Sequence, residues 1–259
     1  MASATPAGCR QLDGALATIP SPRYQFVDCR WELGSPGKGK GLYLEGHIPG
    51  ASFLDVDEDL ADVSVQSEGR HPLPSAERFA GRAGRAGIGD GVFVVAYGSM
   101  GGAERLWWLL RHFGHDDCAV LAGGIESWLG PLSAGEEDID AAVFTPRERA
   151  GDTIAVEQIA RRLGDPELVL VDARLEPRWR GEENPIDNVP GRIPGALNAP
   201  WNEAVPELPE GEVVAYCGSG VTAAVTVHRL ALAGRDVRLY PGSWSQWEML
   251  DLPIERSET

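Results

Sequence analysis

The sequence predicts an α/β protein of two tandem domains, each a mainly parallel sheet with helices on both faces. Short apolar runs of strand length alternate with stretches of helical periodicity, a pattern typical of parallel sheets covered by helices. Four blocks of sequence also occur twice in the same order, which indicates a duplicated domain. The chain has 259 residues, enough for two domains of ordinary size.

The strands are expected where apolar and β-branched residues run together between turn signals. We expect them in the first copy at 26–28, 92–97 and 119–121, and in the second at 168–172, 213–216 and 237–240. A helix is expected from Val221 to Ala233, with Gly234 ending it. Each copy therefore alternates strands with helices.

The internal repeat sets the domain boundaries. The matched blocks are 26–30 with 170–174, 46–51 with 191–196, 94–98 with 213–217, and 123–128 with 242–247. The offset falls from 144 residues, between Asp28 and Asp172, to 119, between Tyr97 and Tyr216. The first copy therefore carries an insertion, which we place within 55–89. We predict an N-terminal domain at 1–135, a linker at 136–150 that is rich in glycine, proline and acids, and a C-terminal domain at 151–259.

Composition and charge exclude several classes of function. The net charge of −16 argues against binding to nucleic acids or to anionic membranes, so an anionic substrate would need a local group of arginines. We find no apolar run of membrane-spanning length and no apolar core in residues 1–11. The four cysteines are far apart, without the spacing of a metal site or a disulfide framework. These features predict a cytoplasmic protein without a bound metal.

Cys217 lies where an expected strand ends and an expected helix begins. The first turn of a helix presents unpaired N–H groups and a partial positive charge, which favour a thiolate. Gly218 and Gly220 allow the backbone to curl so that several N–H groups point at one sulfur. The equivalent position in the first copy is Gly98, which has no nucleophile. We therefore predict that the chemistry belongs to the second copy and that the first is catalytically silent.

The loop Cys217-Gly218-Ser219-Gly220-Val221-Thr222, with 239–244 and Trp247 after it, resembles the active-site region of the tandem-domain rhodanese family. The resemblance extends from Tyr24 to about Pro253 and implies two rhodanese-like domains. No basic residue follows the cysteine, so the loop is most similar to the 3-mercaptopyruvate sulfurtransferase type. The family's first domain usually lacks the nucleophile, as the first copy does here.

The resemblance implies a sulfurtransferase that needs no cofactor. Cys217 would take a sulfane sulfur from a small donor, 3-mercaptopyruvate above all, and hold it as a persulfide. A thiol or cyanide, or a thioredoxin-like reductant, would then remove that sulfur. The loop after the cysteine would bind the substrate and stabilise negative charge through its N–H groups, with Gly218, Gly220, Val221 and Thr222 as the binding residues. Thr222 is equally plausible as a stabiliser of the loop and as the helix cap.

Four further residues are assigned from the resemblance. Arg178 and Arg180 lie in the segment that supplies an arginine for the substrate carboxylate, and Arg178 is preferred. Ser219 would polarise the ketone or relay a proton together with a histidine, and His47 matches that histidine. Arg174 has a counterpart in Arg30, so we interpret the Asp172–Arg174 pair as structural.

The sequence also departs from the family. Arg192 stands where a histidine is common, and 182–190 offers no second arginine for the substrate. The loop 34–41 lacks the aspartate that would complete a serine–histidine–aspartate relay. Sulfur transfer is therefore indicated more strongly than the choice of donor.

Three other functions were weighed. A cysteine phosphatase needs an arginine at the sixth position after the cysteine, where this chain has Ala223. A thiosulfate:cyanide sulfurtransferase stays open, with Arg178 and Arg192 facing an inorganic dianion. A non-catalytic persulfide carrier also stays open, because it would need the same loop. In each case Cys9, Cys29 and Cys118 are predicted to be dispensable.

Overall fold

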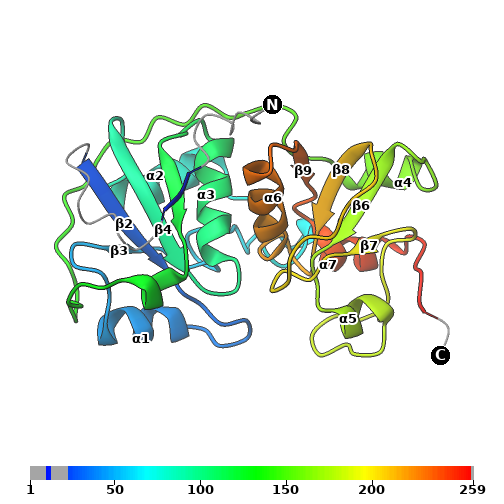
Figure 1. Ribbon diagram of the computed structural model, residues 1–259, viewed down its shortest axis with the longest axis horizontal. Coiled ribbons are helices and arrows are strands. Elements are labelled where there is room, and N and C mark those ends of the chain that lie inside the picture. The colour runs from blue at the N-terminus through cyan, green and yellow to red at the C-terminus, as the bar shows by residue number, and fades with distance from the viewer. Residues whose placement is uncertain (1–9, 13–22, 258–259) are drawn as a thin grey trace. The chain divides into compact units, whose positions relative to one another are not determined.

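The computed structural model describes residues 10–12 and 23–257, which fold into two compact units (Figure 1). Within the described residues, the N-terminal unit comprises 10–12, 23–62 and 74–149, and the C-terminal unit comprises 63–73 and 150–257. No helix in this part of the chain has both the length and the apolar composition needed to cross a membrane.

The N-terminal unit contains a five-stranded parallel sheet with the order β1-β5-β4-β2-β3. Its strands are β1 (Arg10–Leu12), β2 (Arg23–Cys29), β3 (Ser52–Phe53), β4 (Val92–Gly98) and β5 (Cys118–Leu121). Its helices are α1 (Lys38–Glu45), α2 (Ala76–Arg85), α3 (Gly102–His112) and the 3-10 turn η3 (Gly124–Ser127). The helix α3 contacts β4 and β5, and its run of leucines and tryptophans is buried.

The C-terminal unit contains a four-stranded parallel sheet with the order β7-β6-β8-β9. Its strands are β6 (Leu168–Asp172), β7 (Leu197–Asn198), β8 (Glu212–Tyr216) and β9 (Val237–Leu239). Its helices are α4 (Val156–Arg161), α5 (Glu176–Arg180), α6 (Ala223–Leu232) and α7 (Ser243–Trp247), with the 3-10 turns η2 (Gln66–Glu68) and η4 (Glu248–Leu250). The apolar core includes Trp244 and Trp247, both fully buried.

The predicted fold class, two α/β domains with parallel sheets, is confirmed. The six expected strands are present, with ends that differ by a few residues. The sequence did not predict β1, β3 and β7, because strands of two or three residues are too short to show a period.

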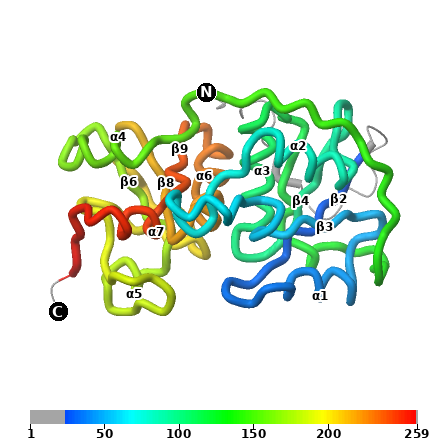
Figure 2. The backbone as a smooth tube through the Cα atoms, turned by 180° about the vertical axis from the view of Figure 1, so that it is seen from behind, coloured from blue at the N-terminus to red at the C-terminus, as the bar shows by residue number. Residues whose placement is uncertain are grey.

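A segment of the first copy's insertion, 63–73, packs within the C-terminal unit. The N–H of Arg70 donates to Ser245 Oγ at 3.0 Å, so the segment is bound to α7. At Gly69 φ is +101°, and a Cβ would lie 2.7 Å from the carbonyl oxygen of Gly242, so only glycine allows this approach. Figure 2 shows the segment in cyan beside α7. A piece of sequence that precedes the second copy by about 80 residues thus becomes part of its structure.

The segment expected to be a linker is bound to the N-terminal unit as far as Arg149. Backbone N–H groups donate from Ala142 to Gly84, from Arg147 to Phe113 and from Arg149 to His112, at 2.7–2.9 Å. Phe144 is buried. The segment 136–149 therefore packs against the N-terminal unit.

Candidate active site

Cys217 follows the last residue of β8 and precedes α6, as its place in the repeat predicts. The N–H of Gly220 donates to its Sγ at 3.1 Å, and the residue is only 2% exposed. Its own N–H donates to Ser243 Oγ at 3.1 Å, and its carbonyl accepts from the N–H of Trp244 at 3.0 Å. The backbone of Cys217 is thus held by hydrogen bonds at its N–H and at its carbonyl, and the loop donates one N–H to the sulfur.

Glycine is required at one position of this loop. At Gly220 φ is +81°, and a Cβ would lie 2.6 Å from the carbonyl oxygen of Pro241. Val221 is buried, and Thr222 immediately precedes α6 without a side-chain capping hydrogen bond. The capping role considered for Thr222 is therefore absent, and the loop is shaped by its glycines.

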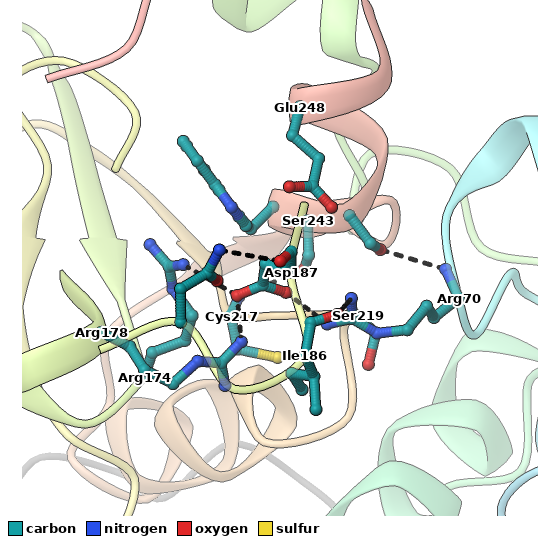
Figure 3. A network of polar contacts seen from close by, with 12 residues as sticks. Arg70, Arg174, Arg178, Ile186, Asp187, Cys217, Ser219, Ser243 and Glu248 are labelled. Atoms are coloured by element: carbon teal, nitrogen blue, oxygen red, sulfur yellow. Dashed lines mark hydrogen bonds and ion pairs between the residues drawn. The ribbon is translucent and has the colours of Figure 1, made fainter. Parts of the chain in front are cut away.

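Two guanidinium groups lie against the residue after the cysteine. A Cβ at Gly218 would be 2.9 Å from Nη2 of Arg70 and 3.1 Å from Nη2 of Arg178. Arg178 comes from α5 and Arg70 from the inserted segment, so elements distant in sequence supply the two cations. Figure 3 shows both side chains near Cys217. The local group of arginines that an acidic protein needs for an anionic substrate is present.

Asp187 lies between these arginines, and its side chain is 1% exposed. Its Oδ1 accepts from Arg70 Nη2 at 2.8 Å, and its Oδ2 accepts from Arg178 Nη2 at 2.5 Å. Arg174 Nη1 is 3.5 Å from the same Oδ2. Burial raises the pKa of Asp187, but Arg178 and Arg70 outweigh it, so the pKa lies below its usual range. Asp187 is therefore an ionised carboxylate at neutral pH.

Asp172 and Arg174 form the structural pair predicted from the repeat. The guanidinium donates to both carboxylate oxygens at 2.7–3.1 Å and to the carbonyl of Gly191 at 2.7 Å. Burial acts to lower the pKa of Arg174, but Asp172 outweighs it and the pKa is raised. The pair fastens the end of β6 to the turn that precedes β7.

Ser219 is joined to a histidine by a short hydrogen bond. Its Oγ lies 2.6 Å from Nδ1 of His71, and the two residues are 6% and 5% exposed. His71 lies in the inserted segment beside Arg70. A serine with a histidine partner, two positions after a cysteine, can pass a proton or polarise a carbonyl.

Comparison with known proteins agrees with this geometry. A model of the rhodanese-like domain matches residues 12–130 and 155–250. The chain belongs to the rhodanese-like family. The predicted family membership is confirmed.

Relatives of similar length carry sulfurtransferase names. A probable 3-mercaptopyruvate sulfurtransferase of Pseudomonas aeruginosa is 39% identical over 259 residues, covering 89% of this chain and 91% of the relative. The putative thiosulfate sulfurtransferase SseB of Mycobacterium tuberculosis is 36% identical over 249 residues, covering 86% and 87%. The crystal structure of SseA from Escherichia coli, described as a 3-mercaptopyruvate sulfotransferase, superposes with a TM-score of 0.73 at 30% identity, covering 86% of this chain and 94% of that one.

The histidine assigned from the sequence, His47, does not contact Ser219 in the Cys217 loop. His47 is fully buried, its Nδ1 is 2.8 Å from the carbonyl of Tyr43, and its Nε2 is 3.1 Å from Oε1 of Glu137. Both ring nitrogens are thus occupied within the N-terminal unit. The contact with Ser219 is made by His71, and this corrects the assignment of His47.

The two arginines assigned from α5 have different surroundings. Arg178 reaches Gly218, whereas Arg180 donates to Glu176 Oε1 at 2.6 Å and is 43% exposed. Residues two apart on a helix face different directions, so only one of the two could reach the site. Arg192 is paired with Glu255 and lies over the ring of Trp179, with 4.0 Å to the centroid. It is not among the arginines beside Gly218.

Sequence reasoning missed Arg70, His71 and Asp187. The first two lie in the insertion that only the first copy carries, and that difference between the copies was the available signal. Asp187 lies in the acidic segment 182–190, where nothing in the local sequence distinguishes it from the neighbouring carboxylates. All three depend on contacts between residues far apart in the chain.

Proposed function

We propose that the protein is a sulfurtransferase that carries sulfur from 3-mercaptopyruvate, through a persulfide on Cys217, to a thiol or to cyanide. The observation that carries the proposal is the Cys217 loop, where Gly220 donates to the sulfur and two arginines lie against Gly218. The names of the rhodanese-like relatives support the same activity. The site and the relatives' names support sulfur transfer, and the two arginines suit a donor that carries a carboxylate.

In the first step the Cys217 thiolate attacks the sulfur of 3-mercaptopyruvate. A sulfur–sulfur bond forms, the carbon–sulfur bond breaks, and the enolate of pyruvate leaves with the bonding electrons. The proton of the donor thiol ends on the enolate carbon, which gives pyruvate. Arg178 and Arg70 bind the carboxylate, because a guanidinium presents paired donors to a planar anion.

Ser219 and His71 act on the ketone of the donor. When Nδ1 of His71 carries the proton, the imidazole donates to Ser219 Oγ over their 2.6 Å contact. The hydroxyl proton of Ser219 is then free to donate to the ketone oxygen, where negative charge develops as the carbon–sulfur bond breaks. General acid–base assistance of this kind contributes about 10²–10⁴-fold to a rate.

In the second step the outer sulfur leaves Cys217. Cyanide takes it as thiocyanate, a thiolate takes it as a persulfide, and in each case the Cys217 thiolate returns. A thioredoxin-like dithiol would accept the sulfur, release it as sulfide and become a disulfide. Backbone N–H groups of the loop stabilise the charged outer sulfur between the steps.

The N-terminal unit is proposed to be catalytically silent because Gly98 holds the position of the nucleophile. A cytoplasmic location is proposed from the cysteines, since Cys29, Cys118 and Cys217 are free thiols.

The test measures products from two donors, with cyanide as acceptor. Pyruvate and thiocyanate should form together from 3-mercaptopyruvate, faster than thiocyanate forms from thiosulfate, and the Cys217→Ser variant should make neither. Faster turnover of thiosulfate would replace the proposed donor. No turnover of either donor, with uptake of sulfur from a protein persulfide, would show a carrier and overturn the enzyme.

A further inference from the structure

Asp187 is a negative charge in the middle of the proposed anion-binding group. Arg70 and Arg178 both lie against Gly218, and both donate a terminal N–H to this one carboxylate. An anionic donor would therefore bind to arginines that already share a counter-charge. Binding an anion does not require this arrangement, since two free arginines would attract one more strongly.

The backbone at Asp187 and after it is held by hydrogen bonds to other parts of the C-terminal unit (Figure 3). Glu248 accepts from the N–H groups of Asn188 at 2.9 Å and Val189 at 2.8 Å. The carbonyl of Val189 accepts from the indole N–H of Trp244 at 3.1 Å, and the carbonyl of Asp187 accepts from Asn184 Nδ2 at 2.7 Å. The backbone that carries Asp187 therefore cannot move away when a donor enters without breaking these hydrogen bonds.

The charges of the group can be counted. Arg174 is matched by Asp172, which receives three of its hydrogen bonds. Arg70 and Arg178 share the single charge of Asp187, which leaves one net positive charge beside Gly218. Asp187 occupies Nη2 of Arg178, whereas Nη1 has no hydrogen-bond partner in the described part of the chain. One cationic donor face is thus left for the substrate.

We propose that Asp187 is a specificity-determining residue that matches the site to donors with one anionic group, such as a carboxylate, and disfavours dianions such as thiosulfate. The inference rests on the proposed function and goes beyond it. A monoanion neutralises the group, whereas a dianion leaves one uncompensated negative charge beside the Cys217 thiolate. In a buried site such an excess charge is costly, and repulsion of the wrong ligand is an effective source of specificity.

The test compares two donors in Asp187→Asn, a variant of the same shape without the charge. The measurement is the rate constant for loading sulfur onto Cys217, at low salt, from thiosulfate and from 3-mercaptopyruvate. The ratio of thiosulfate to 3-mercaptopyruvate should rise about tenfold or more, since one full charge is removed from beside the anion.

The matched control is Glu212→Gln. Glu212 also accepts hydrogen bonds from two arginines, Arg162 and Arg238, each at 2.5 Å. Glu212 is the first residue of β8, however, and therefore lies at the opposite end of that strand from Cys217. The variant removes the same charge from the same kind of bridge. Its donor ratio should equal that of the wild type.

A second variant, Arg70→Met, changes the charge in the other direction. The group then has no net positive charge, so the ratio should fall below that of the wild type. If Asp187 had only a structural role, both variants would load sulfur more slowly from both donors, and by the same factor. A thiosulfate to 3-mercaptopyruvate ratio equal to that of the wild type in both variants would therefore overturn the inference. Melting curves test whether each variant is folded. If Asp187→Asn is unfolded, the donor ratio of Arg70→Met alone decides whether the inference holds. If wild-type Cys217 is loaded by neither donor, the proposed function itself fails.

Discussion

The loop after β4 and the loop after β8 occupy the same place in the two units and differ in what they can hold. Both lie beside an aspartate–arginine pair at the end of a neighbouring strand, Asp28 with Arg30 and Asp172 with Arg174. In both, the hydroxyl of a buried tyrosine at or next to the end of the strand accepts from a backbone N–H, Tyr97 from Ile48 at 3.2 Å and Tyr216 from Ile193 at 3.1 Å. The supporting framework is therefore the same.

The space at the two loops is different. A Cβ at Gly98 would lie 2.7 Å from the carbonyl oxygen of Cys29, and one at Gly102 would lie 2.2 Å from the same atom. The first loop has thus closed onto β2, whereas the second holds a sulfur that receives an N–H. Position 98 therefore has no room for a side chain, and glycine stands there instead of cysteine.

The largest effect that would test this contrast is expected at the serine–histidine pair. Ser219→Ala and His71→Ala should each slow pyruvate formation from 3-mercaptopyruvate by about 10²–10⁴-fold, because the developing charge on the ketone oxygen loses its proton donor. His47→Asn is the control and should leave the rate per folded molecule unchanged. A loss of rate in the control with none in His71→Ala would return the role to His47.

A smaller effect is expected from the two arginines of α5. Arg178→Met should raise KM for 3-mercaptopyruvate about 10–100-fold, since a hydrogen bond to a charged group contributes about 1.5–3 kcal/mol. Arg180→Met, which removes an exposed pair with Glu176, should change KM by less than about twofold. Steady-state kinetics decide between them, and equal effects would contradict the placement of Arg178.

A cysteine placed at position 98 should not act as a second nucleophile. Gly98→Cys in a Cys217→Ser background should form no persulfide, and it should destabilise the N-terminal unit by about 1–3 kcal/mol, because backbone must move away from the new Cβ. Denaturant unfolding and mass spectrometry measure the two outcomes. Sulfur bound at the new thiol would show that the first loop had lost only its nucleophile.

The smallest effect concerns stability in acid. The pKa of Asp187 is lowered in the folded protein, so its ionised form stabilises the fold above the ordinary aspartate pKa, about 4, and this contribution is lost as the pH falls through the lowered value. Asp187→Asn should therefore be less stable than the wild type at pH 7, with the difference shrinking in acid. Urea midpoints across this range test the claim, and a constant difference would contradict it.

The sequence predicted those features that local pattern determines. Cys217 was found because strand, turn and helix signals meet at one residue, and the Asp172–Arg174 pair was found because the repeat shows it twice. The choice between Arg178 and Arg180 could have been made more firmly, since Glu176 and Arg180 are four apart on one helix and form a familiar pair.

The residues that were missed are those whose partners are distant in sequence. Arg70 meets Asp187 across 117 residues, and His71 meets Ser219 across 148. No local pattern marks such contacts, and the insertion was assigned to the first domain by its position in the chain. His47 lies in a block that the repeat shows twice, Gly46-His47-Ile48 and Gly191-Arg192-Ile193, whereas His71 lies outside the repeat.

The most direct test of the account is to locate the transferred sulfur. After exposure to 3-mercaptopyruvate, peptide mass mapping should find one added sulfur on the Cys217 peptide, both in the wild type and in a variant whose Cys9, Cys29 and Cys118 are replaced by alanine. Cys29 and Cys118 are fully buried, and burial raises the pKa of Cys29, which keeps its thiol protonated; Cys9 lies outside the described residues. Sulfur on any of these three, or none on Cys217, would contradict the central claim that the chemistry belongs to the loop after β8.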